Sequence, residues 1–320
     1  MSGGRLLVKK ILLMVPALAA AALLVGFAYA AYTAQRADLG WSPAISRPTY
    51  RDTHPLVVID EGHHNASTAS MLGRYRPFAQ LLKADGYAVR TGKEAFSPGS
   101  LEGVQVLVSA NASGASKPQF LGINVSIGAS GDRAAPAFTP GEVRAVSAWV
   151  KQGGSLLLIA DHAPFGTAVE GLANEFGIKM YKGFLEVPNE ISDPLMFSRE
   201  NGRLGEHPIL SGDAPETAIR RVMTFTGQSL DGPPEANILL RVPANAIEYL
   251  IQEGQEARPG PAGKAQGLAM TWGQGRIVVL GEAAMLTAQV ANNKPFGMNL
   301  PGNDNKQFAL NAMHWLTRKF

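Results

Sequence analysis

Polar residues gather directly after four apolar, strand-like runs, and their types could carry chemistry. They are Asp60, Glu61, His63, His64 and Asn65 after "LVVI", Ser109 and Asn111 around the end of "VQVLVSA", Asp161 and His162 after "SLLLIA", and Glu282 and Gln289 after "RIVVLG". Three of the six histidines follow two of these runs. In open parallel sheets, ligands bind outside the carboxyl ends of the strands. We therefore expect these side chains to line one crevice.

Two kinds of chemistry suit this mixture of side chains. Histidine and carboxylate together bind zinc or a similar divalent metal, and the predicted ligands are His63, His64, Asp161 and His162. A carboxylate beside a histidine also orients it and raises its basicity, which serves general base catalysis. Catalytic roles are predicted for Asp60, Glu61, His63, His64, Asp161, His162 and Glu282. Ligand contacts are predicted for Asn65, Ser109, Asn111 and Gln289.

Each of these residues also has a purely structural interpretation. Asp60 suits the cap of a turn, Asp161 the cap of a helix around 165–177, and Glu282 the N-terminus of a following helix. None of the histidines has the spacing of an H-E-x-x-H zinc motif. The coincidence of several such strand ends at one edge of the sheet favours a pocket.

Composition excludes several other functions. The chain has no cysteine, so cysteine nucleophiles and thiolate metal sites are impossible. Neither G-x-S-x-G nor G-x-x-x-x-G-K-[ST] occurs. Of 29 basic and 26 acidic residues, four and one lie in residues 1–40, which leaves 25 of each beyond them. A nucleic-acid-binding domain usually carries a basic excess, so no nucleic-acid partner is expected.

The N-terminus predicts contact with a membrane. Residues 1–10 are a basic flank, and the 22 residues 11–32 carry no charge, which is long enough to span a bilayer. The flank would stay in the cytoplasm, so we expect a bacterial inner-membrane protein with a periplasmic domain. The alternative is a signal segment cleaved after Ala30, which gives a periplasmic or secreted protein. Residues 33–54 read as a tether and 55–320 as one domain.

Strand-like and helical patterns alternate from residue 55 onward. Buried strands are predicted at 56–60, 87–92, 104–110 and 155–160, and a helix with a capping box at 139–152. Residues 112–138 form an irregular insertion, and a hairpin is predicted at Gly273–Gly275. The fold class is α/β: a flavodoxin-like parallel sheet between helix layers, with an antiparallel extension in the second half.

Several segments resemble class I glutamine-amidotransferase-like domains. They are "TPGEVRAVSAWVKQGGSLLLIADHAPFG", "EHPILSG", "WGQGRIVVLGEAAMLTAQ" and "DNKQFALNAMHWL". The resemblance is to uncharacterised bacterial members and, more distantly, to trehalose-utilisation-type domains, and it covers most of 55–318. The family's enzymes place a cysteine at the turn where this chain has Asp161 and His162. The resemblance therefore implies the fold and the crevice, without amidotransferase activity.

Three functions follow as hypotheses. The first is an envelope domain that binds a small polar ligand or an envelope protein in the crevice. The second is a hydrolase of a sugar, amide or peptide that depends on a metal or on histidine and carboxylate groups. The third is a non-catalytic scaffold in an envelope or transport complex.

Overall fold

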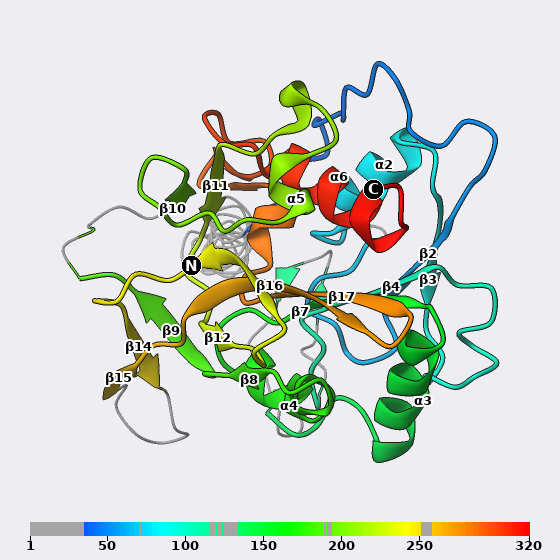
Figure 1. Cartoon of the computed structure of the whole chain (residues 1–320), viewed down its shortest axis with the longest axis horizontal. Helices are drawn as coiled ribbons and strands as arrows, with labels where there is room; N and C mark the ends of the chain where they lie inside the picture. Colours follow the sequence, from blue (N-terminus) through cyan, green and yellow to red (C-terminus); the bar gives the residue numbers. More distant parts are fainter. Residues whose placement is uncertain are drawn as a thin grey trace, which may run out of the picture.

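The computed structural model describes most of the chain beyond its N-terminal segment. The described residues are 35–70, 72–115, 119–120, 123–124, 134–188, 190, 194–250 and 258–320. Within them the fold is built on one large sheet with helices on both faces (Figure 1). The predicted insertion at 112–138 lies in part outside these ranges. Within it, the short strands β5 (Gln119–Phe120) and β6 (Ile123–Asn124) pair with one another.

The central sheet has the strand order β3-β2-β4-β7-β17-β16-β12-β8, with β13 pairing to β16. Its first five strands are mutually parallel: β3 (Ala88–Gly92), β2 (Leu56–Asp60), β4 (Val106–Ala110), β7 (Ser155–Ile159) and β17 (Gly275–Leu280). The rest are antiparallel: β16 (Ala265–Trp272), β12 (Leu230–Asp231), β8 (Lys179–Met180) and β13 (Asn237–Arg241). The predicted parallel sheet with an antiparallel extension is confirmed.

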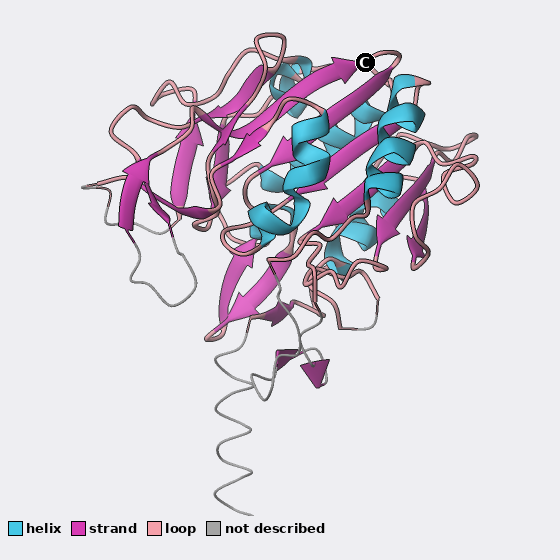
Figure 2. Ribbon diagram, turned by 90° about the horizontal axis from the view of Figure 1, so that it is seen from below, coloured by secondary structure: helices cyan, strands magenta, loops and turns pink. Residues whose placement is uncertain are grey.

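Alternation along the strands divides the core between the two faces of the sheet. Val57, Ile59, Leu157 and Ile159 pack in one apolar cluster, and their even-numbered neighbours pack in the other. The first cluster is covered by α2 (Arg76–Ala84) and α6 (Asn305–Leu316), and the second by α3 (Pro140–Lys151) and α4 (Phe165–Glu175). Figure 2 shows helices lying across the strands of the sheet. Strands buried on both faces are typical of a parallel sheet between helices.

Short elements complete the second half. One small sheet contains β9 (Gly183–Glu186), β14 (Ile247–Leu250) and β15 (Arg258–Pro261), and another contains β10 (Leu195–Ser198) and β11 (Arg221–Thr224). A third sheet joins β1 (Arg36–Ala37) from the N-terminal part to β18 (Ala288–Ala291) and β19 (Lys294–Gly297). The short helical elements are α5 (Pro208–Ser211), η1 (Pro215–Thr217) and η2 (Ala284–Leu286). The predicted hairpin is present, because Trp272 pairs with Gly275 around Gly273 and Gln274.

The predicted membrane partner needs correction, and part of the predicted tether is packed on the domain. Residues 36–50 are packed on the domain: β1 pairs with β18, and Trp41 and Tyr50 pack against the core. In the part of the chain that the structure describes, none of the helices has the length and apolar character needed to span a bilayer. This finding corrects the predicted membrane partner and the inner-membrane localisation drawn from it. The segment 11–32 itself lies outside the described residues.

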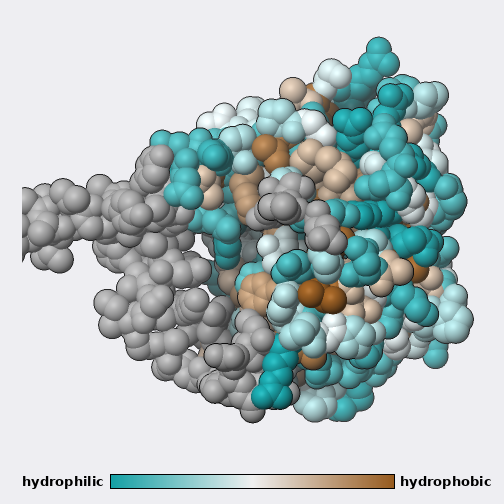
Figure 3. All heavy atoms as spheres, turned by 90° about the vertical axis from the view of Figure 1, so that its left-hand side faces the viewer, coloured by the Kyte–Doolittle hydropathy of each residue, from teal (hydrophilic) through white to brown (hydrophobic). Residues whose placement is uncertain are grey.

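The surface is polar over the described residues. Figure 3 shows one face on which hydrophilic residues predominate and strongly hydrophobic ones occur singly or in small groups. The exposed large hydrophobic side chains of the described chain are Leu39 and Leu250. Scattered apolar side chains of this kind are normal for a folded domain.

Candidate functional site

Two acidic side chains stand directly opposite one another where β7 and β17 end. The parallel register pairs Ile159 with Leu280, so the two strands reach Asp161 and Glu282 in step. The peptide of Ala160 continues this pairing by donating to the carbonyl of Leu280 at 3.0 Å. The predicted placement of these two residues at one edge of the sheet therefore matches the structure.

Asp161 is the more accessible member of this carboxyl pair. Its side chain is half-buried and accepts hydrogen bonds from the backbone N–H groups of His162, at 2.8 Å, and of Ala283. Burial raises the pKa of Asp161, and the nearby charges of His162 and Arg74 oppose that shift without cancelling it. Asp161 is thus a carboxylate held by two peptide groups at the surface of the crevice.

Glu282 is fully buried and holds the turn that follows β17. Its Oε1 accepts from the N–H of Ala284 and its Oε2 from the N–H of Met285, both at 2.7 Å. Burial, together with the charge of Asp161, raises the pKa of Glu282 well above its ordinary value. A carboxyl group in this setting keeps its proton to higher pH than an exposed one.

The segment before α2, which the sequence did not single out, also lies beside the carboxyl pair. Tyr75 is fully buried and its hydroxyl donates to the carbonyl of Ala283 at 3.0 Å. Burial and the charges of Glu282 and Asp161 raise the pKa of Tyr75 well above its ordinary value. Burial also lowers the pKa of Arg74, while Asp161 opposes that effect. No motif or periodicity marks these two residues, and only the fold brings them to the carboxyl pair.

His162 completes this side of the crevice with a defined tautomer. Its Nδ1 lies 2.9 Å from the carbonyl oxygen of Ala163. A carbonyl only accepts hydrogen bonds, so Nδ1 carries a proton; when the ring is neutral, Nε2 presents a lone pair. The ring stacks on Phe184 of β9, with centroids 4.2 Å apart. His162 is therefore a positioned acceptor beside Asp161.

His63 forms a hydrogen-bonded bridge between two carboxylates in place of its predicted metal-binding or catalytic role. Its Nδ1 donates to Asp60 at 2.8 Å and its Nε2 to Glu142 at 2.7 Å, so it bridges two carboxylates. Burial works to lower the pKa of His63, but the hydrogen bonds and charges of Asp60 and Glu142 outweigh it and raise the pKa. Phe96 and Phe138 pack on the ring at 4.4 and 4.8 Å. Both nitrogens are occupied, which contradicts the predicted metal and base roles of His63.

The other predicted residues after β2 hold the loop together. Asp60 also accepts from Asn65 Nδ2 at 3.1 Å and from Ser109 Oγ at 2.8 Å. Glu61 Oε1 accepts from the N–H groups of Ala69 and Ser70, both at 2.8 Å. These bonds give Asp60, Glu61, Asn65 and Ser109 structural roles in place of the predicted catalytic and ligand roles. His64 is exposed in the left-handed region, with φ of 49°.

Asn111 links the two halves of the predicted crevice. The strands β2 and β7 are not neighbours, because β4 lies between them. Asn111 follows β4, accepts from the N–H of Asp161 at 2.9 Å and donates from Nδ2 to Ser67 at 3.2 Å. It therefore positions Asp161, while its own amide is committed to the protein.

Gln289 lies on β18, after the short 3₁₀-helical turn η2. Its Nε2 donates to Thr287 Oγ1 at 2.6 Å, and its buried Oε1 has no partner among the described residues. The same holds for Oε1 of Gln266. Gly227 lies between the Gln266 amide and Glu282. A Cβ added at Gly227 would lie 2.7 Å from Gln266 Nε2 and 2.8 Å from Glu282 Cβ, so the Gln266 amide and Glu282 are near one another. Buried acceptors without donors are rare and need an explanation.

The predicted metal site does not form in the described chain. Across those residues, no group of three or more histidine, aspartate or glutamate side chains is arranged to hold a metal ion. His63 is hydrogen-bonded to two carboxylates. His64 is exposed and follows β2, whereas Asp161 and His162 follow β7. The four side chains predicted as zinc ligands thus do not converge as one donor set.

Comparison with solved structures supports the fold. The chain is similar to the mmIFT52 N-terminal domain, with a TM-score of 0.55 and 15% identity over 82% of this chain and 97% of that one. No protein-family model matches the sequence, and no curated protein matches it. At this identity the likeness concerns the fold alone.

Two further matches have lower TM-scores. A putative GMP synthase protein from Thermoplasma acidophilum is 8% identical with a TM-score of 0.41, over 84% of this chain and 96% of that one. A putative ThuA-like protein from Bacteroides uniformis is 11% identical with a TM-score of 0.36, over 85% and 93%. The order in which the chain forms the parallel strands of the central sheet is that of flavodoxin-like folds.

Proposed function

We propose that this domain binds a small polar ligand at the carboxyl pair of Asp161 and Glu282. The observation that carries the proposal is the pairing of two acidic side chains, both with raised pKa, at the carboxyl ends of adjacent parallel strands. Perturbed acidic groups in this position of an open sheet are typical of functional sites. The domain is then a cysteine-free variant of the amidotransferase-like fold, of the kind found in its uncharacterised bacterial members.

The ligand is one that donates hydrogen bonds. Asp161 supplies a carboxylate, His162 an unprotonated Nε2, and Gln266 a buried amide oxygen without a partner among the described residues. All three are acceptors, so hydroxyl or amine groups complement them. Arg74 next to Asp161 limits the net negative charge of the site and so favours polar over strongly cationic ligands.

A thermal-shift screen with sorbitol, glucosamine and ethanolamine tests the proposal. We expect at least one of these probes to raise the melting temperature of the wild-type protein in proportion to its concentration. Asp161→Asn should remove that response, and Asp52→Asn, which changes an exposed aspartate elsewhere, should leave it intact. A response that survives in Asp161→Asn contradicts the proposed site.

A hydrolase is the second candidate, favoured by the same pair in combination with His162. Glu282, whose pKa is raised well above its ordinary value, combines with Asp161 and His162 to place acidic and basic groups at the same strand ends. The measurement is release of product from chromogenic glycosides, amides and esters in the presence of a chelator. Turnover that is lost in both Asp161→Asn and His162→Gln favours the hydrolase; binding without turnover favours the ligand-binding domain.

A further inference from the structure

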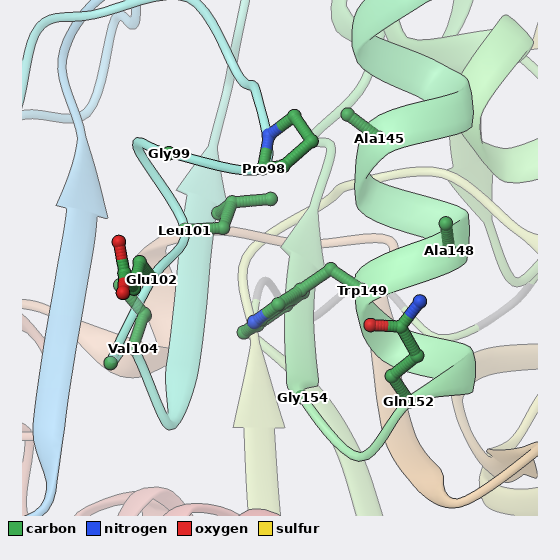
Figure 4. Close-up of a pocket in the computed structure, with 11 residues that line it drawn as sticks. Pro98, Gly99, Leu101, Glu102, Val104, Ala145, Ala148, Trp149, Gln152 and Gly154 are labelled. Carbon is green, nitrogen blue, oxygen red and sulfur yellow. The ribbon is translucent and has the colours of Figure 1, made fainter.

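A concave site lies at the end of the sheet away from the carboxyl pair. It is a groove of about 560 Å³ between α3 and the loop before β4 (Figure 4). Val104 and Gly154, which border it, directly precede β4 and β7, so the groove opens at the amino ends of these strands. Asp161 follows the carboxyl end of β7, which makes this groove separate from the site described above. Its volume is within the ~300–1,000 Å³ of small-molecule sites.

Trp149 of α3 forms a flat apolar platform in this groove. A Cβ added at Gly154 would lie 2.2 Å from Cε2, 2.4 Å from Cδ2 and 2.5 Å from Cζ2 of the indole. Three bonded ring atoms at nearly equal distance mean that Gly154 sits over one face of the ring. The other side of the indole borders the groove and is half-buried. The ring is therefore fixed in orientation before any ligand arrives.

The small residues around the indole keep the platform open. Ala145 and Ala148 form the α3 wall, and Gly99 and Gly103 lie in the opposite loop. A Cβ at Gly103 would meet nothing within 4 Å, so space remains beside the loop. Leu101 adds a second apolar contact above the indole (Figure 4). The groove thus accepts a ring-sized group against Trp149.

The polar groups of the groove are planar and carry no positive charge. Gln152 and Glu102 lie on opposite sides of the indole (Figure 4), and both are exposed. An amide and a carboxylate offer acceptors and one NH₂ donor at the rim. No lysine or arginine is among the groove's lining residues. This chemistry disfavours anions and suits a neutral ligand with one apolar face and a rim of hydroxyl groups.

We propose that this groove is a saccharide-binding site, with a pyranose ring stacked on Trp149 and its hydroxyl groups bonded to Gln152 and Glu102. One face of a pyranose carries C–H groups that pack on an aromatic ring, and its hydroxyls both donate and accept hydrogen bonds. A proline-rich peptide is the other ligand that packs on tryptophan, but such grooves use several aromatic side chains. This groove has one.

Saturation-transfer NMR on the full chain tests the proposal, with cellobiose, maltose and N,N′-diacetylchitobiose as probes at millimolar concentration. At least one disaccharide should show saturation transfer to its ring protons. Trp149→Ala and Gln152→Ala should each weaken binding by about tenfold or more, which is ~1.4 kcal/mol. Because Gln152 is exposed, we expect Gln152→Ala to fold, and this variant still tests the site if Trp149→Ala does not fold.

Two controls separate this site from the carboxyl pair. Arg144→Ala, an exposed change on α3 outside the groove, and Asp161→Asn should both bind the sugar as the wild type does. The proposal is overturned if no disaccharide binds, if binding persists unchanged in Trp149→Ala and Gln152→Ala, or if a polyproline peptide binds the groove in place of the sugars.

Discussion

Asp161 and Glu282 follow adjacent parallel strands in step, although they lie 121 positions apart in the chain. The backbone joins them as well, because Ala283, the residue after Glu282, donates its N–H to Asp161. Two carboxyl groups that interact in this way cannot both ionise without cost, and each therefore alters the titration of the other. This relationship leads to the first prediction.

The free energy of unfolding should fall as pH rises above the ordinary range of a glutamate. A carboxyl group whose folded pKa is raised stabilises the fold fully below its unfolded pKa, and that contribution is lost as pH rises through the folded value. Asp161→Asn removes the neighbouring charge and should flatten this part of the profile. Urea unfolding at a series of pH values measures this free energy for the wild type and for Asp161→Asn, with Asp52→Asn as the control. An unchanged slope in Asp161→Asn would show that the pair is uncoupled.

Removing His63 should destabilise the domain strongly. His63→Ala leaves Asp60 and Glu142 buried without their shared cation, and breaking a buried pair in this way costs about 3–5 kcal/mol. The matched control is His64→Asn, which changes an exposed histidine to a residue that tolerates its positive φ. Denaturant unfolding at neutral pH measures both. A His63→Ala variant as stable as His64→Asn would contradict the bridging role.

The same bridge predicts that stability depends on pH above 6.5. The folded pKa of His63 is raised, so its contribution to stability is complete below the ordinary histidine value of 6.5 and is lost as pH rises through the folded value. Wild-type protein should lose stability over that interval, and His63→Gln should not. Histidine ring resonances followed by NMR give the folded pKa directly. A titration below 6.5 would refute the prediction.

The N-terminus of α3 should limit stability in acid. Glu142 accepts from the N–H of Thr139 at 2.9 Å and from Thr139 Oγ1 at 2.8 Å. Burial opposes the shift, yet the bonds from Thr139, His63 and Phe96 lower the pKa of Glu142 to about 2. Its stabilisation is therefore present above pH 4.5 and lost as pH falls toward 2. Acid unfolding of Glu142→Gln should lack this step.

The cap itself has a simpler test. Thr139→Ala should cost about 1 kcal/mol, because it removes the acceptor for the N–H of Glu142, and Thr139→Ser should restore most of that loss. Chemical denaturation of the three proteins compares them. Equal stability of the alanine and serine variants would show that the hydroxyl contributes nothing.

Gly154 is required by its contact with Trp149. Gly154→Ala places a Cβ 2.2 Å from the indole, so the ring must move, and overpacking of this kind costs about 1–3 kcal/mol. Gly171→Ala on α4 is the matched control: its Cβ meets nothing within 4 Å, and alanine should stabilise the helix by ~0.5–1 kcal/mol. The melting temperatures of Gly154→Ala and Gly171→Ala, each compared with the wild type, test this prediction. A tolerated Gly154→Ala would mean that the indole is not held against the backbone.

Local patterns predicted the elements well, for physical reasons. The strand 56–60 and the helix with its Thr139–Glu142 capping box depend on side-chain types within a few positions, and the structure has both. The polar residues after β2 were located correctly but given the wrong role. Glu142 already serves the capping box, and nothing in the sequence shows that its other oxygen reaches His63 from 79 positions away.

The candidate site depends on long-range pairing that sequence patterns do not encode. Asp161 and Glu282 were predicted separately, and only the adjacency of β7 and β17 makes them a pair. Arg74 and Tyr75 have no motif, because their role comes from the position of the segment before α2 above the end of β17. Asn111 joins Asp161 to the loop after β2, because its Oδ1 accepts from the N–H of Asp161 and its Nδ2 donates to Ser67.

The most direct test of the carboxyl pair is a pH titration of Glu282 by carboxyl ¹³C NMR in the wild type and in Asp161→Asn. We predict that Glu282 titrates well above the ordinary glutamate value of 4.5 in the wild type, and that its pKa falls when the charge of Asp161 is removed. A Glu282 resonance that titrates at or below 4.5, and that does not respond to Asp161→Asn, would contradict the account.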